Sequence, residues 1–313
     1  MKPAPANTPR LAASAILLCA VLGLTLTACD QTDIDPFHND GQYFTVWGYL
    51  DVLEREQTIR VVPVTRFPER IESPTEPQAY IDADVYTTDL STEERIKWTH
   101  SLMQLDDGTY GHMYTARFIV RPGRTYRLEV VRSDGKMAVA ETTVPRTVDQ
   151  GHMQRSEVMY NADSTEIWQD IEVRGIPSPW DMRALYTAGA STNFHVQVPY
   201  GRTGERTTDG GWRTRLHISR DQPAVQEYLR SFPDESGATL VAVGLQLRIL
   251  DENWDPPEGV FDPEVLAQPG VLTNVSGGHG FFGSMGYHAE EWEIDVPQRL
   301  LGYPLVVERP PAN

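Results

Sequence analysis

Residues 80–88 read YIDADVYTT, and every second side chain at the start of this stretch is apolar. In an extended chain Ile81, Ala83 and Val85 share one face, and the polar residues between them point the other way. This period of two is typical of a strand with one buried face, whereas a helix needs apolar residues three or four positions apart. The stretch therefore predicts an antiparallel sheet packed on one side only.

Six further runs of the same character lie between Tyr43 and Val144, and turns containing Gly, Pro or Asp separate them. They are YFTVWGYLDVL, TIRVVPVTRF, ERIKWTHSLMQL, TYGHMYTARFIV, RTYRLEVVR and KMAVAETTV. About seven short strands in about 100 residues indicate an antiparallel β-sandwich of immunoglobulin-like or transthyretin-like type. We therefore predict an all-β fold in which residues 43–148 form this sandwich domain.

Residues 149–313 are predicted to form a second β-rich domain with less regular strands. STEIWQDIEVR and GATLVAVGLQLRIL have strand character, and SRDQPAVQEYLRSF has the one good helical pattern. We expect Asp221 or Ser219 to cap this short helix. Its apolar stripe consists of Val225, Tyr228, Leu229 and Phe232.

The N-terminus predicts export and lipidation. Lys2 and Arg10 precede an uncharged run, LAASAILLCAVLGLTLTA, that ends just before Cys29. A basic start, an apolar run and small residues before a cleavage point describe a secretory signal peptide, here residues 1–28. The run is slightly short for a membrane span. The final LTAC resembles the lipobox of bacterial lipoproteins, which implies acylation of Cys29, for example with palmitate.

Residues 29–42 are polar and acidic and are predicted to be a lipidated tether. Because Cys19 would leave with the signal and Cys29 would carry lipid, the mature chain would hold no thiol for a disulfide, a metal site or a nucleophile. Several acyl chains make a stable anchor. We therefore expect an outer-membrane location, on the periplasmic face or on the cell surface.

The chain is acidic, with 27 Lys and Arg residues against 44 Asp and Glu residues and a formal net charge of −17. Such a surface repels phosphate backbones, so we expect no nucleic-acid partner. Solubility explains the charge without any partner, and a cationic ligand is the alternative.

The segment SGGHGFFGSMGYH contains a literal G-x-G-x-x-G, formed by Gly278, Gly280 and Gly283. A dinucleotide site needs a helix that opens at the last glycine, but the following SMGYHAEEWEIDV alternates like a strand. We therefore expect no cofactor here. The glycines instead predict a tight loop at a strand start, where a side chain would clash or φ is positive. Phe281 and Phe282 would anchor that loop on opposite sides of the strand.

The strand after the glycines holds the best chemical lead. His288 and Glu290 lie on one face of it, near the end where His279 precedes the strand. A histidine and a carboxylate so placed can exchange protons or bind a metal. The simpler explanation is a hydrogen-bonded pair at a sheet end, because no third ligand can be placed. We assign no catalytic residue and no metal ligand.

Two other functional motifs, a calcium-binding EF-hand loop and a serine-hydrolase elbow, are not supported by the sequence. DENWDPPEG offers Asp251, Asn253 and Asp255 at alternate positions, as an EF-hand loop does, but Pro256 stands where that loop needs glycine. The chain contains no G-x-S-x-G elbow, so a serine hydrolase is not predicted.

Several segments occur in order along the chain: the lipobox, YFTVWGYLD, YIDADVYTTD, GTYGHMYT, RPGRTYRLEV, ETTVP and TNVSGGHGFFGSM. Together they resemble a family of uncharacterised Bacteroidota lipoproteins with a domain of unknown function. This chain has His279 and Phe281 where members commonly show an apolar residue and Tyr. The resemblance implies a lipid-anchored envelope protein whose gene often lies beside that of a TonB-dependent outer-membrane transporter. No catalytic residues are established for the family, so none is transferred.

These observations leave three hypotheses. The first is a non-enzymatic module that binds a TonB-dependent transporter, a peptide or a glycan. The second is an envelope hydrolase that uses His279, His288 and Glu290. The third is an adhesin, with Trp212 and Trp254 in or beside polar loops as candidates for stacking on sugars.

Overall fold

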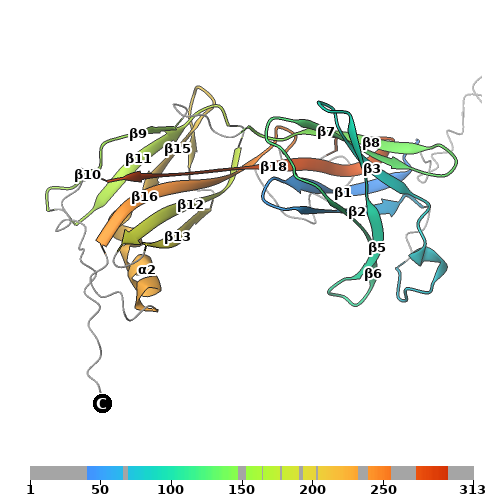
Figure 1. The fold of residues 1–313 in the computed structure, drawn as a ribbon, viewed down its shortest axis with the longest axis horizontal. Coiled ribbons are helices and arrows are strands. Elements are labelled where there is room, and N and C mark those ends of the chain that lie inside the picture. The colour runs from blue at the N-terminus through green and yellow to red at the C-terminus, as the bar shows by residue number, and fades with distance from the viewer. Residues whose placement is uncertain are drawn as a thin grey trace, which may run out of the picture. The chain divides into compact units, whose positions relative to one another are not determined.

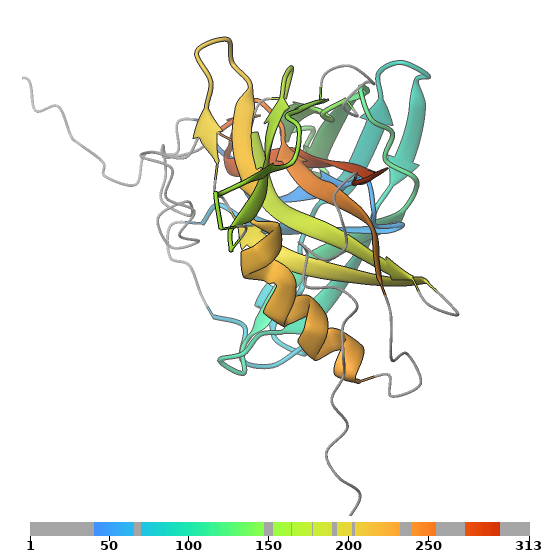
Figure 2. The same cartoon turned by 90° about the vertical axis from the view of Figure 1, so that its left-hand side faces the viewer.

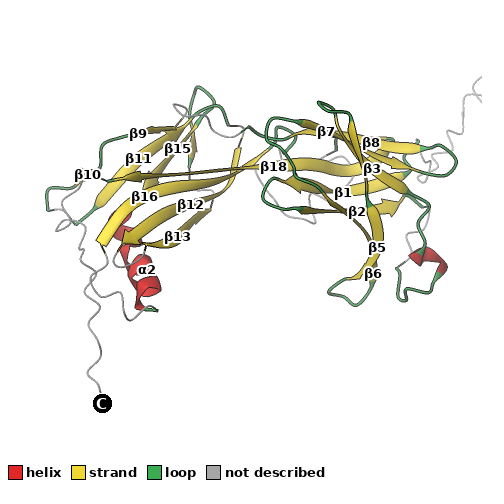
Figure 3. Ribbon diagram, in the orientation of Figure 1, coloured by secondary structure: helices red, strands yellow, loops and turns green. Residues whose placement is uncertain are grey.

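The computed structural model describes residues 41–65, 70–146, 153–163, 165–176, 178–189, 193–201, 204–231, 239–254 and 273–294. This part of the chain consists mostly of β-strands in antiparallel sheets, which confirms the predicted all-β class (Figure 3). None of its helices has the length and apolar character that crossing a membrane requires. The predicted signal peptide, Cys29 and most of the predicted tether lie outside the described residues.

All seven strand-like runs of the first half form strands, and one of them divides at Trp98. The Trp98 ring is buried and its Nε1 donates to Thr87 Oγ1 at 2.8 Å, so the chain turns there from one sheet to the other. The strands are β1 (Phe44–Asp51), β2 (Glu56–Pro63), β3 (Asp84–Asp89), β4 (Glu94–Lys97), β5 (Thr99–Gln104), β6 (Tyr110–Arg117), β7 (Thr125–Val131) and β8 (Met137–Thr143), with a 3-10 turn, η1, at Pro77–Ala79.

The second half contains the three predicted strands, β11, β16 and the second part of β18, and several that the sequence pattern did not reveal. In β12 the side chains of residues 184–188 are all buried, so no alternation marks the strand. The elements are β9 (Met153–Arg155), β10 (Met159–Tyr160), β11 (Ile167–Val173), β12 (Ser178–Gly189), β13 (Asn193–Gly201), β14 (Glu205–Arg206), β15 (Trp212–Leu216), α2 (Ile218–Arg230), β16 (Thr239–Leu250), β17 (Val275–Ser276) and β18 (Gly278–Glu293).

The long strand β18 joins the two halves of the chain in one sheet. Its first part pairs in parallel with β1, and its second part pairs antiparallel with β16 (Figure 1). The eight-stranded sheet has the order β13-β12-β16-β18-β1-β2-β6-β5. The other two sheets have the orders β17-β8-β7-β3-β4 and β10-β11-β15-β14, with β9 beside β11.

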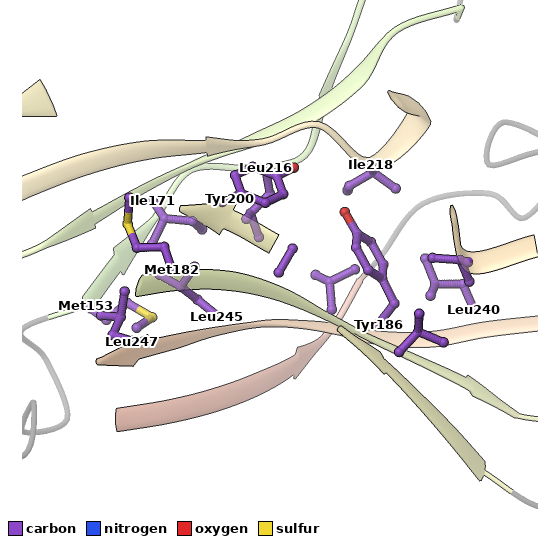
Figure 4. Packing of buried hydrophobic residues seen from close by; sticks show 14 of the residues in the cluster. Met153, Ile171, Met182, Tyr186, Tyr200, Leu216, Ile218, Leu240, Leu245 and Leu247 are labelled. Carbon is purple, nitrogen blue, oxygen red and sulfur yellow. The ribbon is translucent and has the colours of Figure 1, made fainter. Parts of the chain in front are cut away.

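Two hydrophobic clusters fill the space between these sheets. The first core cluster contains first-half residues such as Phe44 and Leu128, together with Val275 and Phe282 from the C-terminal part of the chain. The second core cluster contains second-half residues such as Ile171, Leu216 and Leu247 (Figure 4). The predicted domain limits, 43–148 and 149–313, stay a prediction. The pairing of β17 with β8 and of β18 with β1 nevertheless places C-terminal residues in the first sandwich.

The glycines of the G-x-G-x-x-G motif lie within β18, which begins at Gly278, so the tight loop predicted at the strand start is part of the strand itself. The predicted positive φ is found at Gly280, at +93°. The predicted close packing is confirmed, because a Cβ on Gly278 would lie 2.5 Å from the carbonyl oxygen of Phe44. Phe282 is fully buried in the first core cluster. Phe281 is also buried, and its ring meets that of Trp254 edge-on at 4.7 Å between centroids. Because neighbouring residues in a strand point to opposite faces, the two rings anchor it on both sides.

Helix α2 is the one α-helix among the described residues, and it packs beside β11 and β13 (Figure 2). It begins one residue earlier than expected, with His217 at the N-cap and no side-chain cap. The predicted capping was therefore wrong. Asp221 is buried in the first turn, and Ser219 Oγ accepts from the backbone N–H of Ile167 at 3.0 Å.

The apolar stripe of α2 is narrower than predicted. Val225 and Leu229 are buried in the second core cluster, but Tyr228 is 42 % exposed. Phe232 lies outside the described residues.

Candidate functional site

Strands β11 and β15 present rows of opposite charge on one face. Asp170 is directly opposite Arg215, and Glu172 is directly opposite Arg213. Arg215 donates side-on to Asp170, from Nε at 2.7 Å and from Nη2 at 3.1 Å. Arg213 Nη2 donates to Glu172 at 2.9 Å. Both guanidiniums are therefore fixed by carboxylates on the neighbouring strand.

A buried carboxylate lies where β13 meets the first turn of α2. The hydroxyl of Tyr186 donates to Asp221 Oδ2 at 2.7 Å, and the hydroxyl of Tyr200 donates to the same oxygen. The backbone N–H of His217 donates to the Tyr200 hydroxyl at 2.8 Å, and Arg220 Nε lies 3.4 Å from Asp221 Oδ1. Figure 4 shows the two tyrosines within the second core cluster. This network sets the position of Arg220 and of the Tyr200 ring.

These two features border one hollow of about 390 Å³, which we call the arginine groove. Its volume lies in the range of small-molecule sites, about 300–1,000 Å³. Its lining residues come from β11, β13, β14, β15 and α2, and they are Asp170, Tyr200, Gly204, Glu205, Arg213, Thr214, Arg215, His217 and Arg220.

Two titratable side chains of the groove, His217 and Tyr200, have shifted pKa values. Burial lowers the pKa of His217, and the charges of Arg220 and Arg215 lower it further, whereas Asp221 and Glu166 act more weakly in the opposite direction. Burial and the bond to Asp221 raise the pKa of Tyr200 far above its ordinary value. At neutral pH the groove therefore presents a neutral imidazole and a neutral phenol between guanidinium groups.

His288 and Glu290 lie together on one face of β18, as the alternation predicted. His288 Nε2 is 3.7 Å from Glu290 Oε2, which is beyond a hydrogen bond. Arg155 Nη1 approaches Glu290 Oε1 at 3.4 Å. Within the described part of the chain, His288 Nε2 is buried without a hydrogen-bond partner, and burial lowers the pKa of its ring. His279 lies at the other end of the strand, opposite Thr45, so the structure does not bring it to this pair.

The two tryptophans predicted to stack on ligands are both partly buried in protein contacts. Trp212 packs against the second core cluster at the start of β15. Trp254 contacts Phe281 and also Tyr49, whose ring centroid is 5.9 Å away. Neither ring lines the arginine groove. The sequence signal for the groove was instead the alternation of acids in β11 with arginines in β15.

Asp251 does not present its oxygens to a metal. Its Oδ2 accepts from the backbone N–H of Ser284 at 2.6 Å and from the hydroxyl of Thr142, and its Oδ1 accepts from the N–H of Asn253. A hollow of about 460 Å³ between β8 and the end of β16 borders this turn. Asp255 and Pro256 lie outside the described residues. In the part of the chain that the structure covers, no three His, Cys, Asp or Glu side chains gather as metal ligands would.

A pair of histidines links β5, at the edge of its sheet, to β6. His112 Nε2 lies 3.0 Å from the carbonyl oxygen of Gln78, which only accepts, so this nitrogen carries the proton. His112 Nδ1 therefore accepts from His100 Nε2, also at 3.0 Å. Burial lowers the pKa of both rings, and the charges of His100 and Arg60 lower that of His112 further.

We predict that acid destabilises the protein partly through His112. The unfolded chain takes up a proton on this residue near pH 6.5, but the folded state resists it, so stability present above pH 6.5 is lost as the pH falls toward the lower folded-state pKa. The expected loss is about 1.4 kcal/mol per pH unit for this one group. Urea unfolding at pH 7.5 and pH 5.0 should show a smaller loss for His112→Gln than for wild type. Equal losses would contradict the assignment.

Comparison with known proteins adds one family. Residues 31–178 match the family described as "Domain of unknown function (DUF4249)". This supports the coarser part of the expected resemblance, a domain of unknown function over the first sandwich and the following strands. No curated protein matches the chain.

Solved structures give only distant similarities. The pullulanase of Anoxybacillus sp. LM18-11 is 14 % identical with a TM-score of 0.21, and the match covers 65 % of this chain and 24 % of the pullulanase. Bovine butyrophilin is 11 % identical with a TM-score of 0.21 over 81 % of this chain and 99 % of its own. A tetra-tandem repeat of a large adhesion protein is 11 % identical with a TM-score of 0.20 over 80 % and 49 %. TM-scores this low carry no argument about fold or function.

Proposed function

We propose that this chain is a lipid-anchored binding or accessory module of the outer membrane and is not an enzyme. The observation that carries the proposal is the arginine groove, a hollow of small-ligand size whose charged groups hold one another in place. The Tyr200 phenol that lines it has a raised pKa and donates to the buried carboxylate of Asp221, as Tyr186 also does. Donors and acceptors fixed in this way suit binding.

Two further parts of the proposal rest on the sequence. The LTAC motif before residue 30 supports acylation of Cys29 and a membrane-tethered body. The resemblance to envelope lipoproteins supports a TonB-dependent transporter as the partner. A peptide or glycan ligand is compatible with the same groove.

The decisive experiment is to extract the native protein, tagged at its C-terminus, in mild detergent and to identify what co-purifies in stoichiometric amount. We expect an outer-membrane barrel transporter. The control is Cys29→Ala, which should leave the membrane fraction if Cys29 carries the lipid. Wild-type protein that is extracted alone would contradict the accessory role.

The hydrolase alternative keeps one observation in its favour, the buried His288 Nε2 without a hydrogen-bond partner among the described residues. It requires activity on an ester, peptide or glycoside panel that disappears in His288→Ala while circular dichroism and melting temperature are retained. We expect no activity from either protein.

A further inference from the structure

We propose that the arginine groove binds a carboxylated saccharide, with the sugar carboxylate on Arg213 and Arg215. This inference rests on the proposed binding function and names its ligand.

The two arginines are held so that each can bind a second acceptor. Arg215 uses one edge of its guanidinium for Asp170, and its Cζ lies 5.3 Å from the centre of the Trp168 ring. A guanidinium has five N–H donors, so Nη1 is left for another partner, and the described residues supply none for it. Both side chains are about half exposed, at 48 % for Arg215 and 58 % for Arg213. A ligand oxygen can therefore reach them without displacing the existing pairs.

The spare N–H donors of the groove, and not a net positive charge, suit one carboxylate. Arg213, Arg215 and Arg220 already face Glu172, Asp170 and Asp221 in turn, and Glu205 adds a fourth carboxylate. Because the arginines already share their charge with acids, and the whole chain carries −17, a polyanion such as a phosphate chain is disfavoured. A single carboxylate can instead be held by the N–H donors that these arginines still present.

The remaining lining is suited to hydroxyl groups. Asp170 and Glu205 accept hydrogen bonds, the arginines donate them, and neutral His217 can do both. None of the described lining residues is aliphatic. A peptide with a free C-terminus would present the same carboxylate, but an aliphatic side chain would find no aliphatic partner among the described lining residues. A saccharide with a carboxylate and adjacent hydroxyls matches both features.

The test uses the full chain in mild detergent and isothermal titration calorimetry with trigalacturonate. We expect binding that is weakened about tenfold or more by Arg215→Gln and by Arg213→Gln, as for the loss of one charged hydrogen bond. The matched control is Arg117→Gln, since Arg117 also pairs with an acid, Glu56 at 2.7 Å, but lies outside the groove. This control should bind as wild type does. Methyl-esterified trigalacturonate should also bind at least tenfold more weakly.

A second readout reports the location of the charge. The carboxylate of bound trigalacturonate should raise the His217 pKa measured by NMR, whereas the methyl ester should not. The groups that face this ring are Arg215, Arg220, Asp221 and Glu166. A pKa that stays constant on saturation would place the ligand elsewhere and overturn the inference.

Three other results would also overturn it. The first is the absence of trigalacturonate binding, and the second is equal affinity for the acid and its methyl ester. The third is Arg215-dependent binding of trialanine when neither trialaninamide nor trigalacturonate binds. If the saccharide fails while a transporter still co-purifies with the extracted protein, the proposed function stands and only the ligand assignment falls.

Discussion

Gly280→Ala should prevent stable folding or lower the free energy of unfolding by about 3 kcal/mol or more. Gly280 has φ +93°, which L-residues rarely adopt, and a Cβ there would run into the carbonyl oxygen of Val46 in the neighbouring strand. The obstacle is backbone within a parallel pair, so a rotamer change cannot relieve it. Chemical denaturation followed by tryptophan fluorescence would measure the loss.

Gly135→Ala separates the two causes of that loss. Gly135 also has a positive φ, +84°, but a Cβ there would meet nothing within 4 Å. It should cost only about 1 kcal/mol, the strain of the backbone conformation alone. If the two variants lose equal stability, the close approach of β18 to β1 is not what requires glycine at position 280.

Local pattern was sufficient to predict the strands of the first half, because strands such as β2, β3 and β8 alternate buried with more exposed residues. In β3 the alternation seen in the sequence is the alternation of burial, with Val85 and Thr87 buried and Asp84 exposed. The pattern failed where both faces are buried. Residues 184–188 of β12 and the first part of β18 show no alternation for this reason.

The pairing of β18 with β1 had no local signal at all. Phe44 and Gly278 are partners in the sheet although they are far apart in the chain, and no turn sets their register. The glycines indicate that another backbone segment lies close to this strand, but they do not indicate that the segment is β1. The same limit applied to the candidate site. The sequence shows the alternating acids of β11 and the alternating arginines of β15. It does not show that the two strands pair with these residues opposite each other, or that α2 packs beside them, because both depend on tertiary structure.

Asp251→Asn should lower the free energy of unfolding at pH 7 by about 2–3 kcal/mol, although the neutral amide has nearly the same shape as the carboxylate that it replaces. Asp251 directly follows β16, and its Oδ2 accepts from the backbone N–H and the Oγ of Ser284, at 2.6 and 3.1 Å, and from the Thr142 hydroxyl. The other oxygen accepts from Asn253 N–H at 2.9 Å. Both ends of the carboxylate therefore face donors, and an amide must turn its NH₂ group toward one set of them.

The location of this carboxylate explains why its loss should affect the whole fold. Thr142 belongs to β8 and Ser284 to β18, at the point where β18 changes its partner from β1 to β16. Arg248 Nη1 donates to Asp51 Oδ2 at 2.6 Å, so an ion pair also joins β16 to β1. Burial raises the pKa of Asp251, while the bonds from Thr142 and Ser284 act against that rise.

Glu252→Gln is the matched control, because it makes the same chemical change at the next, exposed residue and should alter stability by no more than about 0.5 kcal/mol. Thr142→Val removes one donor and leaves the carboxylate, so it should cost less than Asp251→Asn. The decisive comparison is the double variant Asp251→Asn with Thr142→Val. If the three donors act as one network around Oδ2, its loss should be smaller than the sum of the two single losses. Strictly additive losses would show that Thr142 and the Asp251 carboxylate stabilise the fold independently, and the proposed link from β8 to the end of β16 would fall.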